Sequence, residues 1–228
     1  MRLVALKLNW NDGGASGTEN TVGYRAVCSA EAIKYNISTL KAAWCRNRRC
    51  PCRKFHDGRY ESQPPSTPDC YESKLRSARG MVFSSGVYSK GKKRGKSIPV
   101  KNVAVGDVAL LTTVFPSSKK KARKVFGCFR LRKPRPTRKS GVIFESDGKM
   151  DIIFPDKVAK RLSFWTYHGP NRNGTYVWGS GLFRYVRSRP ERFFRDLFRL
   201  LGSCRTRDRL IAALPEFRQL GKRIRARK

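Results

Sequence analysis

Short apolar runs separated by turn-forming residues fill the middle of the chain, and they limit the folds that it can adopt. Runs of this length, rich in Val, Ile and Phe and bounded by Gly, Asp, Asn or Pro, are typical of β-strands. They include MVFSSGVYS from Met81, VALLTTVF from Val108, KVFGCFRL from Lys124, VIFES from Val142 and KMDIIFP from Lys149. Asp147-Gly148 separates the last two runs and predicts a tight turn between two strands. Residues 1–10 predict an opening strand.

Helical periodicity flanks this region on both sides. Residues 24–44 carry apolar side chains at steps of three and four, which predicts one helical face, and a short helix is expected near Pro155. Residues 188–202 carry a stripe of Phe and Leu that ends at a glycine, and a second helical segment breaks at Pro215. We therefore predict an α+β fold in three parts: an N-terminal strand, helix and cysteine-rich unit (residues 1–75), a β-barrel (76–187), and C-terminal helices with a basic tail (188–228).

Positive charge is in large excess, because 51 Lys and Arg residues stand against 16 Asp and Glu, for a formal net charge of +35. Such a chain repels itself unless a polyanion shares its surface, so nucleic acid, either DNA or RNA, is the expected partner. The alternative is a generally solvated basic surface, or adaptation to an acidic or salty setting. The first eight residues are too short for a signal peptide, and no run suits a membrane span. We expect an intracellular protein, in the cytoplasm or nucleoid, or in the nucleus of a eukaryote, with no membrane partner.

Two runs of cations are candidates for phosphate contacts. They comprise Lys92, Lys93 and Arg94 in one turn, and Lys119, Lys120, Lys121 and Arg123 in a second. Either run could clamp a nucleic-acid backbone. The same residues could instead form nuclear import signals or solvated turns.

Aromatic side chains are concentrated between Asp151 and Tyr185. Aromatic rings stack on unpaired bases, and asparagine amides can read a base edge. The candidates for a base-binding pocket are Trp165, Tyr167 and Trp178, with His168, Asn171 and Asn173 as polar contacts. Phe164, Phe183 and Tyr185 are assigned to the core. The alternative is that most of these rings fill the core, which is the commoner position for Trp and Phe.

Two of the predicted strands carry short motifs. Gly106-Asp107 opens the run VALL, and the next strand has the form VFGCF around Gly127. At these motifs the chain, over about residues 81–186, resembles the PUA-like superfamily, which includes the EVE, YTH and ASCH domains. The resemblance implies a curved β-barrel that grips nucleic acid. In EVE and YTH members it also implies an aromatic pocket around a modified base, for which Trp165, Tyr167 and Trp178 are the loose matches.

The cysteines suggest a metal site outside the region of resemblance. There are seven in all, an odd number, and Cys45, Cys50, Cys52 and Cys70 are the candidate ligands, with His56 able to replace one of them. Zinc binds thiolates and imidazoles tetrahedrally, and such a site stabilises the fold of a small segment. Cysteines that stay reduced for this purpose suit a reducing compartment. The spacings are C-x4-C and C-x-C rather than C-x2-C. The alternative is reduced, partly buried cysteines beside a basic loop.

Two further functions are compatible with the sequence. Asp147-Gly148-Lys149 has the D-x-K form of metal-dependent nucleases, although a hairpin turn explains Asp147-Gly148 better. No Ser-His-Asp or Cys-His set and no P-loop occurs, so the sequence favours a binding protein over an enzyme. The other alternative is an architectural or ribosome-like protein that binds by charge alone.

Overall fold

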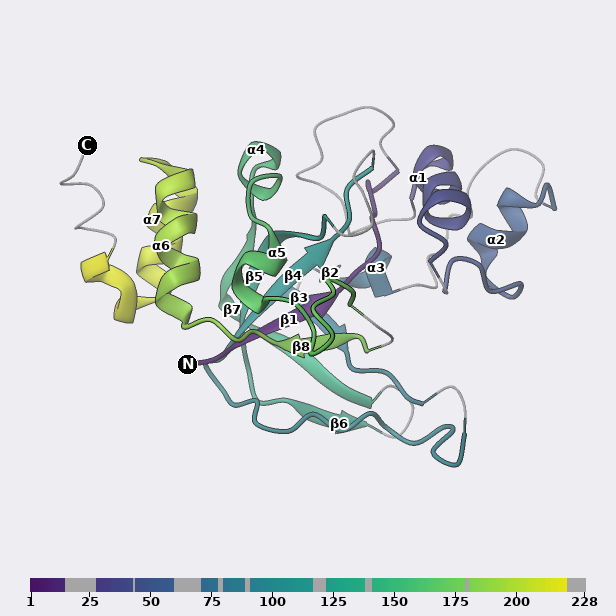
Figure 1. Cartoon of the computed structure of the whole chain (residues 1–228), viewed down its shortest axis with the longest axis horizontal. Coiled ribbons are helices and arrows are strands. Elements are labelled where there is room, and N and C mark those ends of the chain that lie inside the picture. The colour runs from purple at the N-terminus through teal and green to yellow at the C-terminus, as the bar shows by residue number, and fades with distance from the viewer. Residues whose placement is uncertain are drawn as a thin grey trace.

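The computed structural model of the chain describes residues 1–14, 28–42, 44–59, 71–77, 80–88, 91–116, 122–137, 141–178 and 181–220. A strongly curled β-sheet forms the middle of the molecule (Figure 1). The cysteine-rich segment with α1 and α2 lies at one end, and α6 and α7 lie at the other (Figure 1). The predicted α+β class is confirmed, and the sheet has the form of a half-barrel.

The sheet joins strands from distant parts of the sequence. Its order is β2-β3-β7-β5-β4-β1-β8, and β6 also pairs with β7. The strands are β1 (Leu3–Lys7), β2 (Arg76–Ser77), β3 (Gly80–Ser84), β4 (Val108–Thr113), β5 (Lys124–Leu131), β6 (Arg135–Thr137), β7 (Gly141–Ile153) and β8 (Phe183–Tyr185). β1 runs parallel to β4 and antiparallel to β8. The opening strand therefore belongs to the sheet, although it lies at the start of the predicted N-terminal unit.

The prediction of a hairpin at Asp147-Gly148 is wrong, because β7 is one strand of 13 residues. Its first part pairs with β3 and β6, and its second part pairs with β5. Gly148 has a φ of 76°, and its amide donates to Ser146 Oγ at 2.9 Å. A glycine at positive φ lets a strand bend sharply, and here the bend passes the strand from one part of the sheet to the next.

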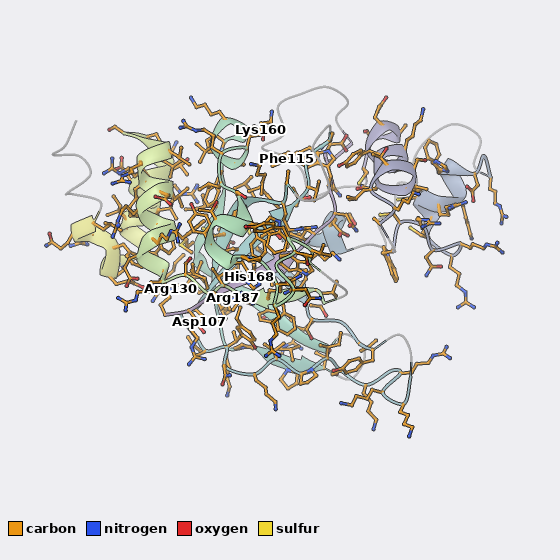
Figure 2. The ribbon with its side chains drawn as sticks, in the orientation of Figure 1. Asp107, Phe115, Arg130, Lys160, His168 and Arg187 are labelled. Atoms are coloured by element: carbon orange, nitrogen blue, oxygen red, sulfur yellow. The ribbon has the colours of Figure 1, made fainter. Side chains whose placement is uncertain are left out.

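The turn before β4 explains the Gly-Asp motif. Gly106 has a φ of 85°, which favours glycine, and Asp107 is buried beside it. The Asp107 carboxylate accepts the amide of Arg2 at 2.7 Å and the amide of Ala104 at 2.9 Å. Asp107 thus fixes the turn and the start of β1 together, at the N-terminal end of β4 (Figure 2).

The helices are short except at the C-terminus. They are α1 (Ala30–Lys34), which continues as a π-helical turn over Tyr35–Thr39, α2 (Pro51–His56), α3 (Tyr71–Lys74), α4 (Asp156–Ala159), α5 (Phe164–His168), α6 (Pro190–Leu201), α7 (Arg205–Ala213) and a 3₁₀ turn over Pro215–Phe217. The predicted helix over residues 24–44 is confirmed from Ala30 to Thr39, while Trp44 lies beyond it and is exposed. None of the helices within the described residues is long and apolar enough to cross a membrane.

The core lies between the sheet and the C-terminal helices. All six residues of β4 are buried, which is typical of a strand covered on both faces. The apolar stripe of α6, which is Phe193, Phe194, Leu197, Phe198 and Leu201, is buried as predicted. Arg130 on β5 donates to the carbonyl of Ala213 at 2.9 Å and so ties the sheet to α7.

Candidate nucleic-acid interface

The three rings expected to line a base pocket are buried in the main core. Trp165 is 8% exposed, Tyr167 4% and Trp178 5%. The Tyr167 hydroxyl donates to Asp196 Oδ2 at 3.1 Å, and its ring packs edge-on against Phe193 of α6. The expectation of an open pocket between these rings is therefore wrong for this structure. The physical reason is that α5, which carries Trp165 and Tyr167, packs against α6 with its aromatic face inward, and Trp178 packs against Phe164 with centroids 4.8 Å apart.

His168 is also buried and does not face a surface where phosphate could bind. Its ring stacks on Phe164 with centroids 5.1 Å apart and an interplanar angle of 17°. Nδ1 lies 3.0 Å from the carbonyl oxygen of Tyr185, so Nδ1–H is the donor and Nε2 the free acceptor. Burial, and then the charges of Arg187 and Arg184, lower the pKa of His168. Figure 2 shows His168 beside the sheet with Arg187 close to it.

Cations surround Trp178. The guanidinium carbon of Arg123 lies 5.0 Å from the Trp178 ring centroid, and that of Arg184 lies 5.7 Å from it. Burial, followed by the charges of Arg123 and Arg184, lowers the pKa of Lys7. The Arg123 Nη1 donates to the Thr112 carbonyl at 2.9 Å. Arg123 was expected to contact phosphate. It is 5% exposed and holds the sheet together instead.

The loop before Trp178 is closed by its own polar groups. Asn171 Nδ2 donates to the Val177 carbonyl at 2.5 Å, and Asn171 Oδ1 accepts from Arg184 at 3.2 Å. Asn171 therefore shapes the loop and is not directed at a ligand, contrary to expectation. Asn173 is exposed at the tip of the loop, as is Tyr176, which is 45% exposed.

The core assignments in the aromatic segment are only partly correct. Phe164 is fully buried, and Phe183 is half-buried against Phe144 with centroids 6.1 Å apart. Tyr185 is 38% exposed, and its hydroxyl donates to the Lys101 carbonyl. The assignment of Tyr185 to the core is wrong, because β8 is an edge strand of only three residues and one of its faces is open.

The basic turn over residues 91–96 is exposed, as its composition predicts. Lys92, Lys93 and Arg94 all face solvent, and Lys93 Nζ lies 5.8 Å from the centroid of the Tyr88 ring. The turn is closed by hydrogen bonds between the backbones of Tyr88 and Lys96, and of Tyr88 and Gly95. Its cations therefore project from a defined backbone. The other predicted phosphate contacts, Lys119, Lys120 and Lys121, lie outside the described residues.

A second cationic surface lies in the cysteine-rich segment. Lys41, Arg46, Arg48 and Arg53 line one hollow, and no acidic residue is among its lining residues. We call this the cationic hollow. Lys41 has a φ of 53°, an uncommon backbone for a lysine, at the end of the π-helical turn. Arg53 is held by Asp57, with Nε 2.7 Å from Oδ2. Lys41 precedes the basic loop beside the cysteines, and the fold brings it to Arg46, Arg48 and Arg53.

Three of the four predicted metal ligands lie around one cavity. Cys45, Cys50 and Cys52 line it together with Cys28, which the sequence did not single out. Cys70 lies outside the described residues. His56 is engaged elsewhere, because Nε2 lies 3.1 Å from Ser38 Oγ and Nδ1 lies 3.3 Å from Asp57 Oδ1. Among the described residues, no three His, Cys, Asp or Glu side chains are already arranged to hold a metal ion.

Asp147 and Lys149, the residues of the possible nuclease motif, lie at the bend in β7. Asp147 Oδ1 accepts the backbone amide of Lys149 at 2.9 Å, as in a turn. Burial raises the pKa of nearby Asp151, which also accepts the Met81 amide at 3.3 Å. The carboxylates of Asp147 and Asp151 therefore each accept a backbone amide near this bend.

Comparison with known proteins gives no relative from which a function could be carried over. No protein-family model, curated protein or solved structure matches the chain.

Proposed function

We propose that this protein binds nucleic acid, chiefly through contacts of its cationic surfaces with the phosphate backbone. The observation that carries the proposal is the cationic hollow, where Lys41, Arg46, Arg48 and Arg53 line one concave surface without an acidic lining residue. Guanidinium groups donate two parallel hydrogen bonds to a phosphate, and a concave wall lets several cations reach one backbone. The exposed turn with Lys92, Lys93 and Arg94 offers a second contact.

Phosphate contacts have a measurable signature, because each one releases counterions. The logarithm of the binding constant falls with the logarithm of salt concentration at a slope of about −0.9 per contact for duplex DNA. Replacing Arg46 and Arg48 with serine should therefore reduce the slope by about 2 and weaken binding to all sequences alike. The matched control replaces Lys157 of α4 and Lys160, the C-cap residue of that helix (labelled in Figure 2), with serine. Both lysines are exposed, and the double substitution removes the same charge.

The comparison of these two variants separates localised binding from binding by charge alone. Fluorescence anisotropy over a salt series, with labelled single-stranded DNA, duplex DNA and RNA, gives the slopes. Localised binding requires a large loss for Arg46→Ser/Arg48→Ser and a small loss for the α4 control. Equal losses would favour an architectural protein that binds through its overall charge. Unchanged binding in both variants would contradict the proposal.

Base reading in a PUA-like barrel is the second candidate. It is supported by the motifs at Gly106 and Gly127 and by two buried polar atoms, Trp165 Nε1 and His168 Nε2, which have no hydrogen-bond partner among the described residues. Exposed Tyr176 lies edge-on to Trp165, with centroids 5.8 Å apart. A base that displaced Tyr176 would face the Trp165 ring, whose Nε1–H could donate a hydrogen bond to it. This reading requires a preference among bases, including modified ones, that persists at high salt and disappears in Tyr176→Ala. The absence of any such preference would leave phosphate binding as the whole activity.

A further inference from the structure

Four cysteines from separate parts of the N-terminal segment meet at one cavity. Cys28 precedes α1, Cys45 lies in the turn after Trp44, Cys50 is the N-cap of α2, and Cys52 lies in the first turn of α2. All four line a cavity with space for about one water-sized sphere. A space of this size between thiols suits a single ion better than an organic ligand.

Apolar side chains and one amide donor surround the four cysteines, of which Cys28 and Cys50 are buried and Cys45 and Cys52 are partly exposed. Trp10, Ile33 and Trp44 line the cavity with apolar surface. Asn9 Nδ2 lies 3.9 Å from Cys45 Sγ, and an amide donor at this position can stabilise a sulfur that carries negative charge. Glu72, which also lines the cavity, accepts the backbone amide of Asn9 at 2.9 Å and so holds that residue in place.

The segment's own apolar core is small. Among the described residues, its buried cluster comprises Cys28, Ala32, Ile33 and Ile37, with Trp10, Cys45, Cys52 and Phe55 packed against them. Its helices are short, with five residues in α1 and six in α2. A core this small needs a cross-link, and a structural metal ion is a common one in small units.

We propose that Cys28, Cys45, Cys50 and Cys52 bind one thiophilic divalent ion, with Zn²⁺ as the expected occupant. Four thiolates match its tetrahedral preference, at Zn–S distances of about 2.3 Å. On binding, each cysteine loses its thiol proton to solvent and forms one sulfur–metal bond; for Cys28 this replaces the hydrogen bond from its thiol to the Trp10 carbonyl, 3.7 Å long. No oxidation takes place. Cys28 replaces Cys70 as the fourth ligand of the set that the sequence predicts.

The proposal links the metal site to the cationic hollow, although it does not depend on nucleic-acid binding. Arg46 follows Cys45 directly, Arg53 follows Cys52, and Arg48 lies between Cys45 and Cys50. A metal bound to these cysteines would fix the backbone that carries three of the four cations of the hollow. Removing the metal should therefore lower the affinity for nucleic acid, but metal binding is measured separately.

Metal analysis of the full chain, purified under reducing conditions without chelator, is the first test. We expect about one equivalent of zinc per chain, and a Co²⁺-substituted protein with the intense ligand-field bands of a tetrahedral thiolate site. The Co²⁺ spectrum of the unaltered chain needs no variant, so a variant that fails to fold does not affect it. A chain that binds neither ion under these conditions, or whose cysteines are recovered as disulfides, would overturn the proposal.

Serine variants then identify the ligands. Cys28→Ser, Cys45→Ser, Cys50→Ser and Cys52→Ser should each lose the bound metal or lower its affinity at least tenfold. Cys204→Ser is the matched control, because Cys204 is half-buried between α6 and α7, outside the cavity. Retention of metal by Cys70→Ser supports Cys28 as the fourth ligand. Retention by Cys28→Ser together with loss by Cys70→Ser would overturn that assignment.

Discussion

Gly127 shows how one missing side chain sets the distance between two strands. A Cβ atom at this position would lie 2.6 Å from the Ile152 carbonyl oxygen and 3.0 Å from Ile153 Cδ1. Both atoms belong to β7, which pairs with β5 at this point. The glycine of the VFGCF motif is therefore required by the close approach of the neighbouring backbone, whatever the protein binds.

Gly127→Ala should consequently lower the free energy of unfolding by about 1 to 3 kcal/mol. Urea denaturation measures the change. Gly181→Ala is the control, because the nearest atom to its added Cβ would be 3.6 Å away, an ordinary contact. A loss in the control as large as that in Gly127→Ala would contradict the steric explanation.

His168 should make stability depend on pH. Burial and the charges of Arg187 and Arg184 lower its pKa in the folded chain, whereas unfolding restores an ordinary value of about 6.5. The unfolded state then binds more protons, so the contribution of His168 is fully present above about pH 6.5 and is lost as the pH falls towards the folded-state pKa. His168→Asn keeps a donor for the Tyr185 carbonyl but does not titrate. The variant should lose less stability between about pH 7.5 and pH 5.5, measured by urea denaturation. An identical loss in both proteins would show that other groups cause it.

At the scale of elements, the contact between α5 and α6 is what encloses the aromatic segment. Tyr167→Phe removes the hydrogen bond to Asp196 and keeps the ring against Phe193. The free energy of unfolding should fall by about 1 kcal/mol, measured by thermal or urea denaturation. Tyr176→Phe is the control, since Tyr176 is largely exposed, and it should change stability by less than about 0.5 kcal/mol. Equal effects of the two substitutions would argue against this role for Tyr167.

The sequence predicts individual helices and strands better than the contacts between them. Apolar runs and helical stripes located β1, β4, β5 and α6 correctly, because each strand is a nearly continuous apolar run and α6 carries an apolar stripe at helical spacing. The bend at Gly148 was mistaken for a hairpin, because a glycine at positive φ serves a turn and a strand bend equally well. Trp178 and Arg123 were both picked out as binding residues, yet they pack against each other. Their pairing depends on strand order, which local sequence does not encode. Cys28 was missed for the same reason, since only the fold brings it to Cys45.

At the scale of the whole molecule, charge dominates. The chain carries +35, and the described residues contain few ion pairs, most of them partly exposed, such as Arg135 with Glu145 at 3.0 Å. Exposed pairs of this kind contribute about 0 to 1 kcal/mol each. Repulsion among the remaining cations therefore opposes folding at low ionic strength, and any ion that screens them or binds to them should stabilise the native state.

Two sources of stabilisation should thus be separable in one thermal denaturation series. Sodium chloride should raise the midpoint temperature by screening, and it should do so equally in the native chain and in Arg46→Ser/Arg48→Ser, apart from their small difference in charge. A short nucleic acid, added at the same total ionic strength, should raise the midpoint further. Binding to the folded state alone adds about 2.7 kcal/mol when the free ligand is at a hundred times its dissociation constant. The variant should keep the response to salt and lose most of the response to nucleic acid, because only the latter requires cations fixed around one hollow. A chain that responds to salt and shows no added response to nucleic acid would have a positive surface without a binding site.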